Sequence, residues 1–155
     1  MEKHYIVEVK YEERSSFLLW HVDGFILSDN KLLVFKSLEE ARAYADKENI
    51  LVDDRVDSFD YSMTAGLIAG IEDKDKCGLI LNLWNLLSDL SQATGIPFEG
   101  DRDDVLSLYE KLVFGSDLPI LKSNTSGEFS NEDKKRIKHV IAGGIYSFRD
   151  AIYPD

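Results

Sequence analysis

The sequence predicts an α+β fold with an N-terminal antiparallel β-meander and one helix, followed by a helical C-terminal half of three main helices. Three observations lead to this prediction. Apolar residues recur with a period of two near the N-terminus, the period becomes helical after residue 37, and long amphipathic stripes dominate from residue 76 onward.

The N-terminal part contains short apolar runs that are typical of strands. Tyr5, Val7 and Val9 alternate with residues expected on the opposite face. Turn signals at Asp23-Gly24 and at 28–31 separate the runs, and such short connections favour an antiparallel meander. The expected strands cover residues 4–12, 16–22, 25–27 and 32–35, and a further short strand is possible at 50–52.

A helix is expected over residues 38–48. The segment Ser37-Leu38-Glu39-Glu40 has the pattern of a capping box, in which the Ser37 side chain accepts a bond from a first-turn amide. We expect this helix to end near Asn49.

Three amphipathic helices are expected in the C-terminal half, over residues 76–94, 101–114 and 131–152. Gly95 is expected to end the first and Gly115 the second, whereas Ser130 is expected to cap the third. The apolar stretch 118–121 lies in the loop-rich segment between the second and third helices. Gly143 and Gly144 each cost the third helix about 1 kcal/mol relative to alanine, which predicts close approach of a neighbouring helix or a kink.

The length of 155 residues is typical of a single domain over residues 1–155. A subdivision is also possible, into a β-rich part at 1–52 and a helical part at 76–155. The acidic segment 53–75 would then join them, either as a long connection or with short structure that the pattern does not reveal.

Negative charge is concentrated in the middle third of the chain. The net charge is -11, and residues 53–104 contain 12 acidic but only 4 basic residues. The acids form three clumps, at 53–60, 72–75 and 99–104. Such a surface repels nucleic acid and anionic membranes and attracts a basic partner. We therefore expect no direct binding to nucleic acid or to membranes.

The sequence offers no pattern for catalysis. The three histidines and the single cysteine lack metal-ligand spacing, and the glycines match no phosphate-binding motif. Cys77 has acidic neighbours that oppose its ionisation. We therefore expect no catalytic residue, no metal site, no cofactor and no enzymatic activity. With no visible signal peptide and no possible internal disulfide, we expect a cytoplasmic protein.

Two interpretations of the acidic clumps remain open. Acidic loops can simply keep a protein soluble. However, Phe59, Tyr61 and Phe98 are interleaved with the acids, and protein interfaces favour aromatic anchors within a charged rim.

The segments 17–27 and 32–41 together have a strand, turn, strand and capped-helix layout. Over roughly residues 5–50 this layout resembles the immunity proteins of bacterial contact-dependent growth inhibition systems, which belong to toxin–immunity pairs. The resemblance implies tight binding of one cognate toxin, commonly through a basic C-terminal nuclease domain whose active site is covered. It supplies no functional residue by position.

Our hypothesis for the partner-binding anchors comes from the charge pattern. The proposed anchors are Asp53, Asp54, Asp57, Asp60, Tyr61, Asp101, Asp103 and Asp104. Two alternatives are a DNA-mimic or anti-restriction inhibitor of a host nucleic-acid enzyme, and a small-molecule-binding protein or enzyme of unknown activity.

Overall fold

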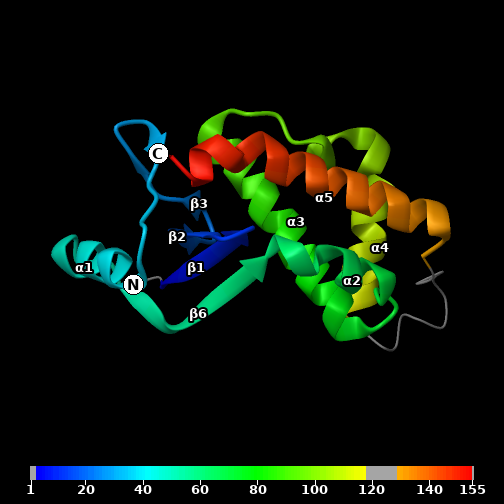
Figure 1. Cartoon of the computed structure of the whole chain (residues 1–155), viewed down its shortest axis with the longest axis horizontal. Helices are drawn as coiled ribbons and strands as arrows, with labels where there is room; N and C mark the ends of the chain where they lie inside the picture. Colours follow the sequence, from blue (N-terminus) through cyan, green and yellow to red (C-terminus); the bar gives the residue numbers. More distant parts are fainter. Residues whose placement is uncertain (1–2, 118–128, 155) are drawn as a thin grey trace. The chain divides into compact units, whose positions relative to one another are not determined.

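The computed structural model describes residues 3–117 and 129–154, so the apolar stretch 118–121 lies outside the described residues. The fold is α+β, with N-terminal strands in a mixed sheet followed by helices (Figure 1). The chain forms two compact units. Unit 1 comprises Met1–Ser62, Asp89–Ile96 and Phe148–Asp155, and unit 2 comprises Met63–Ser88 and Pro97–Ser147.

Unit 1 contains a four-stranded sheet in the order β3-β2-β1-β6. Its strands are β1 (His4–Tyr11), β2 (Arg14–His21), β3 (Gly24–Phe25) and β6 (Val52–Asp60). β1 pairs with β2 antiparallel but with β6 in parallel. The expected antiparallel meander is confirmed for β1, β2 and β3, but the sheet as a whole is mixed because β6 joins it in parallel. Parallel neighbours require a crossover connection, and α1 (Leu38–Lys47) lies within it.

The acidic segment that sequence analysis treated as a connection begins with a strand. Residues 53–60 belong to β6, and they are followed by the short helices η1 (Tyr61–Met63) and α2 (Thr64–Ala69). Aspartate is depleted in strands, so its abundance here concealed the strand. In the sheet that the structure describes, β6 is an edge strand. Charged side chains are tolerated at such an edge and discourage pairing with other chains.

The expected strands at 25–27 and 32–35 are shorter in the structure and divided between two sheets. β3 belongs to the larger sheet, whereas β4 (Leu27–Ser28) and β5 (Lys31–Leu32) form a two-stranded hairpin. Asp29 and Asn30 both have positive φ angles, of 54° and 63°. Two such residues in a two-residue loop are characteristic of a type I′ hairpin turn.

The expected capping of α1 is confirmed. The Glu40 amide donates to Ser37 Oγ at 3.1 Å, and Glu40 Oε2 accepts a bond from the Lys36 amide at 3.1 Å. The helix ends before Asn49, whose φ of 57° is left-handed. Its Ala41 packs in a cluster of apolar residues, and the other buried members of that cluster are Ile6, Leu19 and Phe35.

Strand β1 is buried on both faces, although its sequence pattern predicted one buried face. Ile6 and Val7 are both completely inaccessible to solvent. Within unit 1, the end of the chain also binds this sheet, because the Tyr153 hydroxyl donates to the Val9 carbonyl at 2.5 Å. Burial raises the pKa of the Tyr153 phenol, so the hydroxyl keeps its proton and remains a donor.

The three main helices expected in the C-terminal half are confirmed as α3 (Lys74–Thr94), α4 (Leu106–Asp117) and α5 (Asn131–Ile152). Residues of α3 and α5 belong to both units. The second helix starts later than expected, because 3-10 turns η2 (Glu99–Asp101) and η3 (Asp103–Val105) precede it. It also continues past Gly115, where an added Cβ would lie 2.8 Å from the Cys77 sulfur. Gly115 is thus a close-packing position rather than a helix end.

The close approach expected at the paired glycines of α5 occurs at one of them. A Cβ added to Gly144 would lie 2.8 Å from Leu87 Cδ1 and 2.9 Å from Phe98 Cε1, whereas one added to Gly143 would meet nothing within 4 Å. These two glycines therefore form a matched pair for testing the packing.

We predict that Gly144→Ala lowers the free energy of unfolding by about 1–2 kcal/mol, because the added methyl group overpacks the contact with Leu87 and Phe98. Gly143→Ala should instead raise it by about 0.5–1 kcal/mol through helix propensity. Urea unfolding of both variants measures these effects. Equal stabilisation by both substitutions would contradict the close packing.

Helix α5 begins with a reciprocal capping box. The Asp133 amide donates to Ser130 Oγ at 3.0 Å, and Asp133 Oδ2 accepts from the Ser130 amide at 3.0 Å and from Lys111 Nζ at 2.7 Å. Burial by itself raises the pKa of Asp133, but the bonds from Lys111 and Ser130 outweigh it and hold the pKa below its usual value.

We predict that Asp133→Asn lowers the free energy of unfolding by about 1 kcal/mol at neutral pH, because the ionised form makes the stronger bonds. A carboxylate with a lowered folded-state pKa stabilises the fold above its unfolded pKa of about 3.9. The difference between wild type and variant should therefore shrink as the pH falls through the folded-state pKa. Urea unfolding across this pH range measures it. Glu132→Gln, in the same helical turn but exposed, is the control and should change stability by less than about 0.5 kcal/mol.

Candidate functional site

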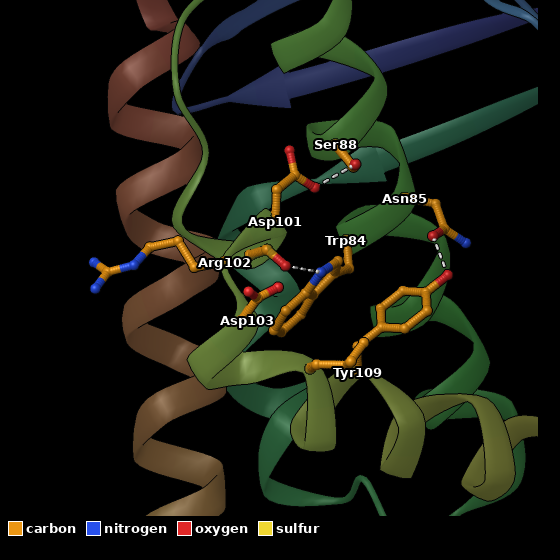
Figure 2. Close-up of a pocket in the computed structure, with 9 residues that line it drawn as sticks. Trp84, Asn85, Ser88, Asp101, Arg102, Asp103 and Tyr109 are labelled. Carbon is orange, nitrogen blue, oxygen red and sulfur yellow. Dashed lines mark hydrogen bonds between the residues drawn. The ribbon is translucent and has the colours of Figure 1, made fainter.

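Unit 2 contains a hollow of about 270 Å³ between α3, the 3-10 turns and the start of α4. We call it the Trp84 hollow. Figure 2 shows its lining side chains and the hydrogen bonds among them. The lining residues are Trp84, Asn85, Ser88, Gly100, Asp101, Arg102, Asp103, Leu106 and Tyr109.

The floor of the hollow is aromatic and tightly packed. Trp84 is almost completely buried, and its indole Nε1 donates to the Gly100 carbonyl at 3.3 Å. The rings of Phe98 and Tyr109 lie about equally far from the Trp84 ring, with centroid distances of 6.0 and 6.1 Å. A Cβ added to Gly100 would lie 2.8 Å from Trp84 Nε1, so only glycine lets the backbone approach the indole this closely.

Two hydrogen bonds between side chains hold the polar groups around this floor. Ser88 Oγ donates to Asp101 Oδ1 at 2.5 Å, and the Tyr109 hydroxyl donates to Asn85 Oδ1 at 2.8 Å (Figure 2). The Ser88 bond orients one oxygen of the Asp101 carboxylate and leaves the second oxygen available as an acceptor.

The two arginines near the hollow, Arg102 and Arg136, form ion pairs with Asp104 and Glu99 rather than with Asp101 or Asp103. Figure 2 shows the Arg102 side chain directed away from the Trp84 indole, and its Nε lies 3.4 Å from Asp104 Oδ1. Arg136 pairs with Asp104 at 3.3 Å and with Glu99 at 3.0 Å.

Asp101 and Asp103 carry the negative charge of the hollow itself. Within residues 3–117 and 129–154, neither carboxylate forms a salt bridge. The hollow is consequently acidic, and it is suited to hold a cation.

The structure places the sequence-predicted acids of residues 53–60 on β6 in unit 1 and those of residues 101–104 in unit 2. Only the second group contributes to the Trp84 hollow, through Asp101 and Asp103. Asp104 instead pairs with two arginines. The proposed anchors are therefore distributed over both units.

Two acids of the first group have local structural roles. Asp53 Oδ1 accepts a bond from the Arg55 amide at 2.8 Å, and this bond is the main reason its pKa lies below its usual value. Asp60 Oδ1 accepts bonds from the Ser62 hydroxyl at 2.7 Å and from the Ser62 amide, which likewise lower its pKa. The Asp53 bond lies where the register of β6 shifts, and the Asp60 bonds close the turn into η1.

Among the described residues, the other two acids of this group, Asp54 and Asp57, form no such bond to a neighbouring backbone amide. Asp57 pairs with Arg55 at 3.3 Å, and Arg55 is exposed whereas Asp57 is partly buried. Asp54 is exposed on the edge strand and has no ion pair in the part of the chain that the structure describes.

The aromatic residues interleaved with the acids are more buried than the anchor hypothesis requires. Phe98 is only 4% exposed and belongs to the core. Tyr61 is half-buried against the Tyr11 ring, and Phe59 lies edge-on to Trp20. Phe98 therefore cannot be an interface anchor, and it acts instead by supporting the Trp84 hollow.

Sequence analysis did not identify the residues of α3 and α4 that line the hollow. Trp84 and Tyr109 were assigned to apolar core stripes, and neither Asn85 nor Ser88 was selected. The available signal was the polar pair Asn85 and Ser88, which follows Trp84 on neighbouring positions of one helix. Helical spacing alone does not show that the acidic turns lie against this face.

The reactive side chains elsewhere are engaged in the fold. Cys77 is fully buried and its thiol donates to the Leu112 carbonyl at 3.4 Å. His4 and His21 stack on each other in unit 1 with a centroid distance of 4.5 Å. Across the described residues, no group of three or more potential ligands is arranged to hold a metal ion.

The comparisons with known proteins were negative: no family model, no curated protein and no solved structure matches this chain. In the part of the chain that the structure describes, none of the helices has the length and apolar character needed to span a membrane. The functional argument therefore depends on the geometry and charge of the Trp84 hollow and of β6.

Proposed function

We propose that this protein is an immunity protein that binds a cognate toxin, most simply through a basic C-terminal nuclease domain, and neutralises it by covering the active site with an acidic surface. The observation that carries the proposal is the Trp84 hollow, in which Asp101 and Asp103 lie without a cationic partner among the described residues. Carboxylates in such a setting attract a positive protein surface and repel phosphate groups.

The proposed inhibition follows from the chemistry of nucleases. A nuclease binds the phosphates of its substrate with basic residues, so an acidic surface can occupy the same groups. Electrostatic steering then raises the association rate above the 10⁵–10⁶ M⁻¹s⁻¹ that is typical of unsteered partners. Shape and buried contacts decide the lifetime of the complex.

The two acidic groups support different parts of this mechanism. Asp54 on β6 is exposed and Asp57 is partly exposed, and charges at the rim of an interface mainly affect the association rate. Asp101 and Asp103 are exposed residues that line a concave site with an aromatic floor, which a partner side chain can enter. Contacts of this kind mainly affect dissociation.

The proposal is tested by searching the neighbouring genes for a large toxin gene and titrating the protein calorimetrically with the catalytically inactivated C-terminal domain of its product. We predict nanomolar binding that weakens as the ionic strength rises from about 0.01 M to about 0.15 M, where screening shortens the Debye length from about 30 Å to about 8 Å. The double variant Asp101→Asn with Asp103→Asn should bind at least about ten-fold more weakly, a loss of about 1.4 kcal/mol.

Glu110→Gln is the matched control for these variants. Glu110 is an exposed acid of α4 that does not line the hollow, so its neutralisation should change affinity less than about two-fold. An absence of binding to the toxin domain, or failure of the protein to protect cells that produce the active toxin, would contradict the immunity function.

A further inference from the structure

We infer that the Trp84 hollow receives one arginine side chain of the partner, with the guanidinium between Asp101 and Asp103 and the carbon stem against Leu106 and Tyr109. This inference rests on the proposed function, because it names the partner group that the same site binds. It also makes a claim about the hollow that can be tested without the partner.

The size of the hollow indicates a single side chain. Sites for cofactors and drug-sized ligands usually have volumes of about 300–1,000 Å³, and this hollow of about 270 Å³ lies below that range. An arginine side chain entering from a partner surface is small enough to fill it.

The walls of the hollow suit a group that is both apolar and cationic. Leu106 is 54% exposed at its mouth, and the half-buried Tyr109 ring borders the same space. A long basic side chain can cover these apolar surfaces with its methylene stem while its charged end meets the carboxylates. A simple metal ion would leave Leu106 and Tyr109 uncovered.

The arrangement of acceptors favours arginine over lysine. Figure 2 shows the carboxylate of Asp101 held by Ser88, and Asp103 lines the same hollow. A planar guanidinium has five donors in a rigid fork, so it can bond two carboxylates and stack on an aromatic ring at once. An ammonium group is a compact, strongly hydrated charge that matches this geometry less well.

The position of the acids near the start of α4 does not by itself explain their orientation. Acids near a helix start stabilise the helix dipole. However, the dipole does not determine which way a side chain turns. The Asp101 side chain bonds to Ser88 of another helix, so it is held toward the hollow rather than on its own turn.

The inference is tested by heteronuclear NMR titration of the protein with capped arginine, N-acetyl-argininamide. Binding should shift the indole N–H resonance of Trp84 saturably, with a dissociation constant in the millimolar range. The indole resonance of Trp20, which donates to Asp89 in unit 1, should remain unchanged and serves as the internal control. The neutral isostere N-acetyl-citrullinamide should not bind, and N-acetyl-lysinamide should bind at least about three-fold more weakly.

Variants of the protein link the shift to the proposed contacts. Asp103→Asn should weaken arginine binding about five- to ten-fold, because it removes a charge-assisted bond. Glu110→Gln removes an equal charge from the same unit outside the hollow and should leave binding unchanged. An unchanged urea-unfolding midpoint of each free variant will show that the fold is intact.

The outcomes separate this inference from the proposed function. The arginine assignment is overturned if the Trp84 resonance does not respond, if citrulline binds equally well, or if lysine binds more tightly. It is also overturned if the inactivated toxin domain binds wild type and Asp103→Asn equally. In that last case the immunity function stands. Binding of arginine without any binding of the toxin domain would support the arginine site in the hollow and contradict the immunity function.

Discussion

The packing of the Phe98 ring against two glycines is the constraint on which the candidate site depends. Within unit 2, an added Cβ on Gly144 would lie 2.9 Å from this ring, and one on Gly100 would be closer still. The missing side chains let the segment before α4 lie against α3, which brings the Gly100 carbonyl to the Trp84 indole. Without this contact, the acidic turns would have no aromatic floor.

A second constraint is the distribution of charge around that packing. Arg102 and Arg136 pair with Asp104 and Glu99, so the cations nearest the hollow neutralise its surroundings rather than its interior. The remaining carboxylates retain their attraction for an external cation. A protein with a large net negative charge thus gains a local site because its few basic residues are engaged beside it.

The candidate site was only partly accessible to sequence analysis. Asp101 and Asp103 were found because acids cluster there, but the same criterion selected Asp53 and Asp60, whose carboxylates accept bonds from residues two positions further along the chain. Charge density does not distinguish an acid that caps a turn from one that faces a hollow. Trp84 was missed as a site residue because helical periodicity shows only which face of α3 is buried. It does not show that the acidic turns lie next to that face.

By itself, the sequence determined the elements whose signals are local. The capped helix α1, the stripes of α3, α4 and α5, and the strands β1 and β2 follow from periodicity and capping within each segment. Only the tertiary structure decided the parallel pairing of β6 with β1 and the meeting of the acidic turns with Trp84. Both depend on contacts between segments far apart in the chain, and such contacts are selected by packing and hydrogen bonding that no single segment encodes.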